Sequence, residues 1–312
     1  MTGLPRGAAE SARREGLDGL RFLVCVGGGP ESAETLDFAT RVLKAVGGDL
    51  TILYVAPKVP QSIRDEVAMS HRKLAEWDAH LPGVAFLRFA RDRFAEAGLL
   101  KLDEREKPIV RDAPQTEFGG AFELGHLGTY GESVLFRIRE GEIAEEIRRE
   151  TRCAAYDLLI IGAGTNRRLQ HKLAQFGETS ILFVKNVRPG PYRFLVCTGG
   201  EQAGTALAEF TARAARALHL GVTVLSVDDL RQSRESAERW VRQLAAVFTA
   251  GGVETRTLVL RGSLVKTIVE AAGEDHVIVI GRSNVPEIKK FFFGSRPIRV
   301  IQEARCPVLH VI

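Results

Sequence analysis

The stretch Arg21-Phe22-Leu23-Val24-Cys25 occurs a second time in the 312-residue chain, as Arg193-Phe194-Leu195-Val196-Cys197. The two copies align without a gap over 35 residues, Arg21–Val55 against Arg193–Val227, and about a third of the aligned residues are identical. A match of this length at one fixed offset indicates an internal duplication. The chain is therefore predicted to contain two copies of one domain.

Each copy reads as a strand, a turn, a helix and a second strand. Phe22–Val26 and Leu50–Val55 are short apolar runs, typical of strands buried on both faces of a parallel sheet. Phe38, Val42 and Val46 recur at helical spacing, and Gly47-Gly48 is expected to end that helix. Further strands are expected at Val134–Ile138, Leu158–Ile161, Ile181–Val184, Thr257–Leu260, Val277–Ile280 and Val308–Ile312. This alternation predicts an α/β fold of two tandem, doubly wound, five-stranded parallel sheets.

The two copies differ in length at two places. Copy one carries about 51 extra residues, an insertion at about 80–131. The extra segment is predicted to hold a helix around Gln61–Ala79, a charged stretch Lys101–Arg111 and a glycine-rich stretch Phe118–Gly131, of which Gly125–Gly131 is expected to be a flexible turn. After its fourth strand, copy one is shorter by about eight residues. The predicted domains are a tail (1–20), domain 1 (21–187) and domain 2 (192–312), with Lys185–Pro191 as the linker.

Composition excludes several classes of protein. With 45% hydrophobic and 26% charged residues, the chain is too apolar for a disordered protein, and its apolar runs are too short to span a membrane. The net charge of +4 comes without a dense Lys/Arg stripe, so no nucleic-acid binding is expected. Neither a secretory signal nor a CxxC motif is recognised, which favours a cytoplasmic protein with buried, reduced thiols at Cys25, Cys153, Cys197 and Cys306. The seven histidines show no metal-ligand spacing.

The predicted topology places ligands at the carboxyl ends of the strands, where the strand order reverses. The turns after strand one (Gly27–Gly29 and Gly199-Gly200) and after strand four (from Gly162 and from Gly281) lie there. Glycines at such turns let backbone N–H groups approach a phosphate beside a helix N-terminus. The alternative is that they only make a tight turn between strand and helix.

One loop in copy two has a sharper pattern: Gly281-Arg-Ser-Asn284, nine residues, then Gly294-Ser295. Here the chain resembles the universal stress protein family, whose nucleotide motif is Gly, two residues, Gly, nine residues, then Gly-Ser or Gly-Thr. Phe22–Ser32, Arg139–Ile147 and Ala304–Ile312 are also similar to segments of that family. The resemblance covers nearly the whole chain as two tandem domains. It implies a fold of the adenine nucleotide alpha-hydrolase-like kind.

The resemblance also implies a site for ATP or another adenine nucleotide in copy two. Gly281, Gly294 and Ser295 fit the family's phosphate-binding loop, Val227 fits an adenine-packing position, and Ile280 lies beside the pocket. Two positions depart from the motif. Asn284 replaces its second glycine, and Gly199, like Gly27 in copy one, stands where the family's nucleotide binders carry an aspartate.

Copy one is expected to lack such a site. Gly164 and Gly177 have the spacing of Gly281 and Gly294, but Gly177 lies only four residues before the strand Ile181–Val184. If Thr165–Phe176 is the helix, then the phosphate loop has been deleted. The basic residues Arg167, Arg168, His171 and Lys172 are expected to form a solvated helix face.

The leading hypothesis is a non-catalytic regulatory protein of the stress response with an adenine nucleotide in domain 2. Because family members pair through their last strand, the two domains are expected to pair within one chain, and two chains to form a homodimer. One alternative is a nucleotide-free module that binds a protein partner through the insertion. The other is an adenylating enzyme of related fold, but Thr198–Ala203 lacks the serines and the acid of that enzyme's loop.

Overall fold

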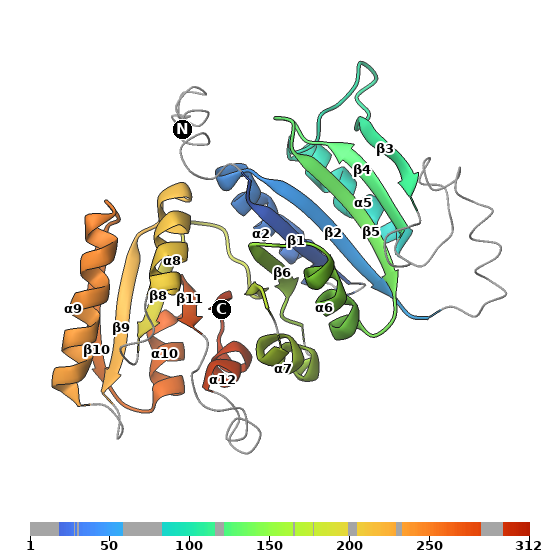
Figure 1. The fold of residues 1–312 in the computed structure, drawn as a ribbon. Helices are drawn as coiled ribbons and strands as arrows, with labels where there is room; N and C mark the ends of the chain where they lie inside the picture. Colours follow the sequence, from blue (N-terminus) through green and yellow to red (C-terminus); the bar gives the residue numbers. More distant parts are fainter. Residues whose placement is uncertain are drawn as a thin grey trace. The chain divides into compact units, whose positions relative to one another are not determined.

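The computed structural model describes residues 19–27, 29, 31–58, 83–115, 122–164, 166–176, 178–198, 205–228, 233–281 and 296–312. The chain divides into two compact units, Met1–Gly162 and Ala163–Ile312. Each unit is a mostly parallel sheet with helices on both faces (Figure 1), which confirms the predicted α/β class.

The sheet of the first unit has the strand order β6-β1-β2-β5-β4-β3. Helices α2 and α5 cover one face of it and α6 covers the other (Figure 1). The elements are β1 (Arg21–Val26), α2 (Glu31–Val46), β2 (Asp49–Ala56), α5 (Val84–Glu96), β3 (Val110–Gln115), β4 (Phe122–Leu127), β5 (Ser133–Glu140), α6 (Ile143–Cys153) and β6 (Leu158–Gly162).

Helix α2 follows the predicted pattern. Phe38, Val42 and Val46 are buried, and they lie on one face of the helix because they recur every four residues. The helix ends at Val46, where Gly47 has a φ of 72° and Gly48 a φ of 116°. These left-handed angles are open to glycine at little cost, so the Gly-Gly pair turns the chain directly into β2.

The insertion corrects the sequence analysis at two points. The sheet of the first unit has six strands, because β4 pairs antiparallel with β5 and β3 pairs antiparallel with β4. The stretch Gly125–Gly131 is not a flexible turn throughout, since Gly125, His126 and Leu127 belong to β4. Leu124 and His126 are buried there against the sheet, and that burial holds a glycine-containing segment in a strand. Helix α5 had no counterpart in the sequence analysis, and the predicted helix Gln61–Ala79 lies outside the described residues.

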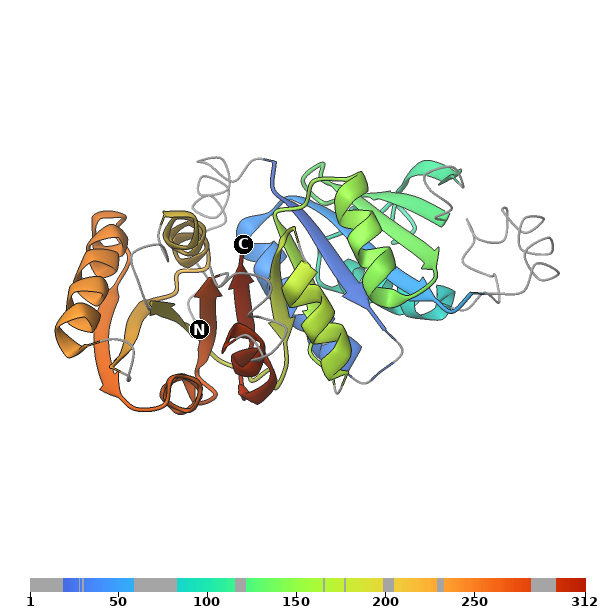
Figure 2. The ribbon, with the colours of Figure 1, turned by 60° about the horizontal axis from the view of Figure 1, so that its bottom comes forward.

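The sheet of the second unit has the order β10-β9-β8-β11-β12-β7. Figure 2 shows α8 and α9 on one face of this sheet and α10 and α12 on the other. The elements are α7 (Arg167–Phe176), β7 (Ser180–Val184), β8 (Arg193–Thr198), α8 (Thr205–Ala217), β9 (Val222–Asp228), α9 (Arg234–Ala250), β10 (Thr255–Arg261), α10 (Leu264–Ala272), β11 (His276–Gly281), α12 (Arg296–Glu303) and β12 (Val308–Val311).

The strand β7 comes from the first sequence copy but lies in the second compact unit. It pairs antiparallel with β12, with Leu182 opposite Leu309. Lys185 and Asn186, directly after β7, donate hydrogen bonds to the carbonyl groups of Ile301 and Arg305, at and just beyond the end of α12. The compact units and the sequence copies therefore differ by the segment α7–β7.

The four cysteines are free thiols but are not all buried. Cys25 and Cys306 are buried and Cys197 is half-buried, as expected for residues in or beside strands. Cys153 is exposed, which corrects the prediction for that residue. It is the last residue of α6 and follows Glu150, the last buried residue of that helix.

Candidate functional site

The candidate site lies at the carboxyl ends of β8, β9 and β11 in the second unit. The strand order reverses beside β8, because β9 and β10 lie on one side of it and β11 and β12 on the other. A crevice for a ligand is expected at such a point. The buried hydroxyl of Ser226 donates to the carbonyl oxygen of Thr198 at 3.0 Å and ties the ends of β8 and β9 together.

Three of the seven predicted site residues lie in the described part of the chain. Val227, near the end of β9, is 2% exposed, and Ile280, near the end of β11, is 6% exposed. Both side chains thus belong mainly to the core of the second unit. Gly281 ends β11 and is half-buried. The other four predicted residues, Gly199, Asn284, Gly294 and Ser295, lie outside the described residues.

Gly281 has a packing reason as well as the predicted functional one. A Cβ atom at this position would lie 3.3 Å from Cδ1 of Leu207 in α8. A glycine therefore lets α8 lie close to the end of β11. At the matching place in copy one, a Cβ on Gly162 would lie 2.8 Å from Oγ1 of Thr35 in α2. Both copies thus use glycine where the first helix of the copy crosses the fourth strand.

The two copies differ in charge where their first helix begins. The first turn of α2 contains Glu31 and Glu34. The first turn of α8 contains no acidic residue. The N-terminus of a helix carries the positive end of its dipole, so a phosphate is favoured at α8, whereas two carboxylates already occupy that field at α2.

The turn after β1 is also closed by its own side chains. The hydroxyl of Ser32 accepts from the N–H of Gly27 at 3.1 Å and donates to the Gly27 carbonyl at 2.7 Å. Glu31 folds over Gly29, since its carboxylate would meet a Cβ atom there. The equivalent residues of copy two are Ala203 and Gly204, which carry no such groups. The backbone N–H of Gly27 is therefore already used and unavailable to a ligand.

Sequence reasoning did not select Asp228, the last residue of β9. It is half-buried at the carboxyl end of the sheet, one residue after the predicted adenine-packing position. The equivalent residue of copy one is Ala56. The sequence did contain a signal for this residue, because an acidic residue ends the second strand in copy two but not in copy one.

Copy one carries a buried ionic network under α6. Glu150, which is 0% exposed, accepts hydrogen bonds from Arg137, from Nε of Arg139 at 2.6 Å and from the hydroxyl of Tyr156 at 2.7 Å. Glu123 of β4 pairs with Arg137 from the other side. Burial, together with the Glu150 carboxylate, raises the pKa of Tyr156 above its ordinary value.

Copy two has an apolar layer at the same place. Arg137 and Arg139 pair with Leu53 and Val55, and their equivalents Leu258 and Leu260 pair with Leu225 and Val227. Glu150 is the eighth residue of α6, and Ala271 is the eighth residue of α10. The fold itself therefore does not require this ionic network, which only copy one has. The network lies in the same unit as the turn after β1 that is closed to ligands.

Metal ligands and membrane-spanning helices were looked for among the residues that the structure describes. In those residues, no group of three or more His, Cys, Asp or Glu side chains is arranged to hold a metal ion. Likewise, no described helix is both long and apolar enough to cross a membrane.

Comparisons with known proteins bear on the fold and the family. The model of the universal stress protein family matches the chain twice, over residues 20–187 and 192–311. A universal stress protein from Archaeoglobus fulgidus DSM 4304 is 14% identical, with 93% of this chain and 95% of that chain covered and a TM-score of 0.63. A functionally unknown protein from Pseudomonas aeruginosa PAO1 is 15% identical, with 95% and 93% covered and a TM-score of 0.58. No curated protein matches the chain.

Two further structures, of universal stress proteins in complex with cAMP and with dAMP, each match 39% of this chain. Their TM-scores are 0.35 and 0.32, at 20% and 25% identity. These scores are too low to carry either ligand over to this chain.

Proposed function

Because the chain belongs to the universal stress protein family, as a tandem form with two matches along its length, we propose that it is a non-catalytic regulatory protein whose second copy binds an adenine nucleotide. The observation that carries this proposal is the difference between the two first helices. The first turn of α8, as far as the structure describes it, contains no acidic residue, whereas Glu31 and Glu34 lie in the first turn of α2. A phosphate is therefore favoured in copy two and opposed in copy one.

The carboxyl ends of β9 and β11 supply the other residues of the proposed site. Gly281 begins the proposed phosphate loop, to which the family motif adds Asn284, Gly294 and Ser295. The carboxylate of Asp228 can accept a hydrogen bond from the amino group of an adenine base. It takes the place of the aspartate that the family's nucleotide binders carry at the position of Gly199. Val227 and Ile280 supply the apolar floor beneath the base.

Isothermal titration calorimetry with ATP, ADP and AMP tests the proposal. Gly294→Asp puts a carboxylate where phosphate oxygens are expected, and we expect it to weaken binding at least about tenfold, roughly 1.4 kcal/mol. Gly177→Asp is the matched control, since Gly177 holds the same spacing in copy one, and it is expected to bind like the wild type. If no nucleotide gives a heat signal, or if Gly294→Asp binds as tightly as the wild type, the proposed site is wrong.

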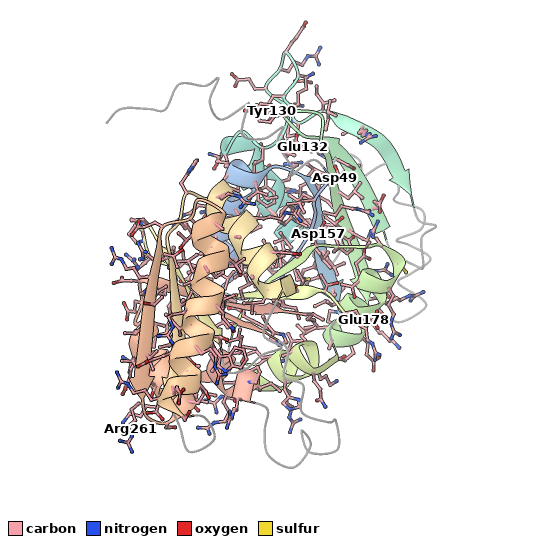
Figure 3. All side chains as sticks on the ribbon, turned by 60° about the vertical axis from the view of Figure 1, so that its left-hand side comes forward. Asp49, Tyr130, Glu132, Asp157, Glu178 and Arg261 are labelled. Atoms are coloured by element: carbon pink, nitrogen blue, oxygen red, sulfur yellow. The ribbon has the colours of Figure 1, made fainter. Side chains whose placement is uncertain are left out.

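A second candidate function is a protein-interaction module built on the insertion. One observation favours it: of the six exposed large apolar side chains among the described residues, four lie between Phe89 and Tyr130, namely Phe89, Leu102, Val110 and Tyr130. Tyr130 lies in the turn between β4 and β5 and is labelled in Figure 3. Calorimetry that is silent for every nucleotide favours this candidate over the first.

We further propose that the protein acts in the cytoplasm as part of the stress response and that its two domains pair within one chain. The antiparallel pairing of β7 with β12 supports the pairing, since β7 derives from the first copy. Gel filtration with light scattering measures the assembly. A mass of two chains supports the homodimer and a mass of one chain contradicts it, while a monomer without contact between its domains contradicts the pairing within one chain.

A further inference from the structure

The strand β10 forms one edge of the sheet in the second unit. It pairs with β9 along its whole length, and no described strand pairs with its other side. Arg256, Thr257 and Arg261 are exposed, and the remaining four residues of the strand are only half-buried. Figure 3 shows Arg261 pointing away from the sheet at the end of this strand. An open edge of seven residues without proline is unusual, because unpaired edges promote association.

Two hydrogen bonds fix which backbone groups of β10 point outward. The N–H of Val222 donates to the carbonyl oxygen of Glu254, and the N–H of Gly262 donates to that of Asp228. The backbone N–H and C=O groups of the even-numbered residues in this segment therefore point toward β9. Since strand residues alternate, the N–H and C=O groups of Thr255, Thr257, Val259 and Arg261 face away from the sheet.

Copy one shows what this edge can hold. The N–H of Gly141 donates to the carbonyl oxygen of Ala56 just as Gly262 does to Asp228, so β5 and β10 correspond in register. The outward side of β5 is occupied by β4, which pairs with it antiparallel over six residues, Phe122–Leu127. The residues of β5 are accordingly buried or half-buried, whereas those of β10 are exposed or half-buried. The insertion thus fills in copy one a strand position that is open in copy two.

Charge indicates what kind of strand fits the open position. In copy one the guest strand β4 supplies Glu123 to Arg137 of β5. On β10, Arg256 is 67% exposed and paired only with the exposed Glu254 among the described residues, and Arg261 has no ionic partner among them. A second copy of β10 would bring two more arginines into the same ribbon. An acidic segment would instead place a carboxylate opposite each.

We propose that the open edge of β10 binds an extended, acidic peptide segment of a partner protein, which adds to the sheet as an antiparallel strand. Main-chain hydrogen bonds to Thr255, Thr257 and Val259 provide the affinity, and Arg256 and Arg261 select acidic residues five positions apart. The half-buried Leu258 and Leu260 gain cover when the strand is added. This inference does not depend on nucleotide binding.

The probe is the fluorescein-labelled peptide Thr-Glu-Val-Thr-Val-Thr-Glu-Thr, and fluorescence anisotropy on the full chain measures its binding. Its two glutamates match the spacing of Arg256 and Arg261. A peptide with lysine in place of both glutamates is the matched ligand control. We expect the acidic peptide to bind at least about fivefold more tightly at low salt, with the difference shrinking as salt is added.

Two variants separate the backbone contribution from the charge contribution. Val259→Pro removes an outward N–H without touching the β9 pairing, since proline is tolerated on the open side of an edge strand, and it is expected to abolish binding. The double variant Arg256→Glu and Arg261→Glu keeps the backbone and is expected to prefer the lysine peptide. Arg299→Glu with Arg305→Glu changes the same charge at two exposed residues on and just after α12, which packs on β12 and not on β10, and is expected to bind like the wild type.

Several results overturn the proposal. If the two peptides bind equally well, or if the Arg256→Glu, Arg261→Glu variant keeps the wild-type preference, the partner segment is not selected for its acidic residues. If Val259→Pro binds the peptide as tightly as the wild type, the peptide does not add to the sheet as a strand. Circular dichroism checks that this variant is folded. A homodimer that dissociates on Val259→Pro shows that a second copy occupies the edge instead.

Discussion

Replacing Glu150 is expected to destabilise the first unit more than any other single charge change in it. Glu150→Gln keeps the size of the side chain but removes the charge that faces Arg137 and Arg139. Glu150 is fully buried, so water cannot replace it. Removing one partner of a buried ion pair costs about 3–5 kcal/mol. For a unit of this size each kcal/mol lowers the melting temperature by about 2–4 °C, so we expect a decrease of about 6–20 °C.

Differential scanning calorimetry and urea unfolding followed by circular dichroism measure this loss in the full chain. In a Trp77→Phe background, the fluorescence of Trp240 on α9 reports the second unit and is expected to change little. Glu123→Gln is the matched control, because the Glu123 side chain is 25% exposed and Arg137 keeps Glu150 as a partner. We expect the control to cost about 1 kcal/mol.

The apolar layer of copy two provides a second, independent variant of the first unit. The triple variant Arg137→Leu, Arg139→Leu and Glu150→Ala copies that layer into the first unit. Because replacing a whole buried ion cluster with apolar residues is often neutral or stabilising, we expect the triple variant within about 1 kcal/mol of the wild type or above it. If Glu150→Gln lowers the free energy of unfolding by less than about 1 kcal/mol, or if the triple variant lowers it equally, then buried unpaired charge does not determine the stability of this unit.

Three further predictions concern single side chains. Burial and the nearby positive charge of Arg91 lower the pKa of His126 from 6.5 to about 4. Between these pH values the imidazole is therefore protonated in the unfolded chain but neutral in the folded chain. Stability is therefore expected to fall by about 3 kcal/mol between pH 6.5 and pH 4, and His126→Leu is expected to flatten this slope in urea titrations at each pH. Gly48→Ala is expected to cost about 2–3 kcal/mol and Gly47→Ala only about 1, since both have positive φ but a Cβ on Gly48 would press on the Leu20 carbonyl at 2.5 Å; equal losses in chemical denaturation would contradict this. Lys185→Met is expected to cost about 1–2 kcal/mol, because the ammonium group holds the end of α12 through the Ile301 carbonyl at 2.6 Å, and hydrogen exchange of α12 amides that is unchanged in the variant would count against it.

Much of the fold followed from local pattern. The strands with continuous apolar runs, such as Phe22–Val26 and Leu158–Ile161, lie where the sequence predicted them, within one or two residues. They could be predicted because a strand buried on both faces must be apolar throughout, whatever lies around it. The insertion could not be predicted in the same way. Its strand β4 contains Gly125 and His126, and pairing with β5 on one side and β3 on the other holds them in a strand.

The candidate site was predictable in part. The motif located Gly281 at the end of a strand, since the carboxyl ends of parallel strands are fixed by the chain order alone. The packing of Leu207 against that glycine, and the closure of the equivalent turn of copy one by Ser32, depend on how a helix crosses a strand. No spacing in the sequence encodes that crossing.

The sequence alone predicts the duplication, the α/β class, the family and the positions of the repeated strands, because all four depend on residue type and spacing along the chain. The tertiary structure alone decided that Glu150 is shared by two arginines and that β10 lacks the neighbour that β5 has. Those features depend on segments far apart in the chain, and desolvation and strand pairing act on distances in space, which the linear order does not specify.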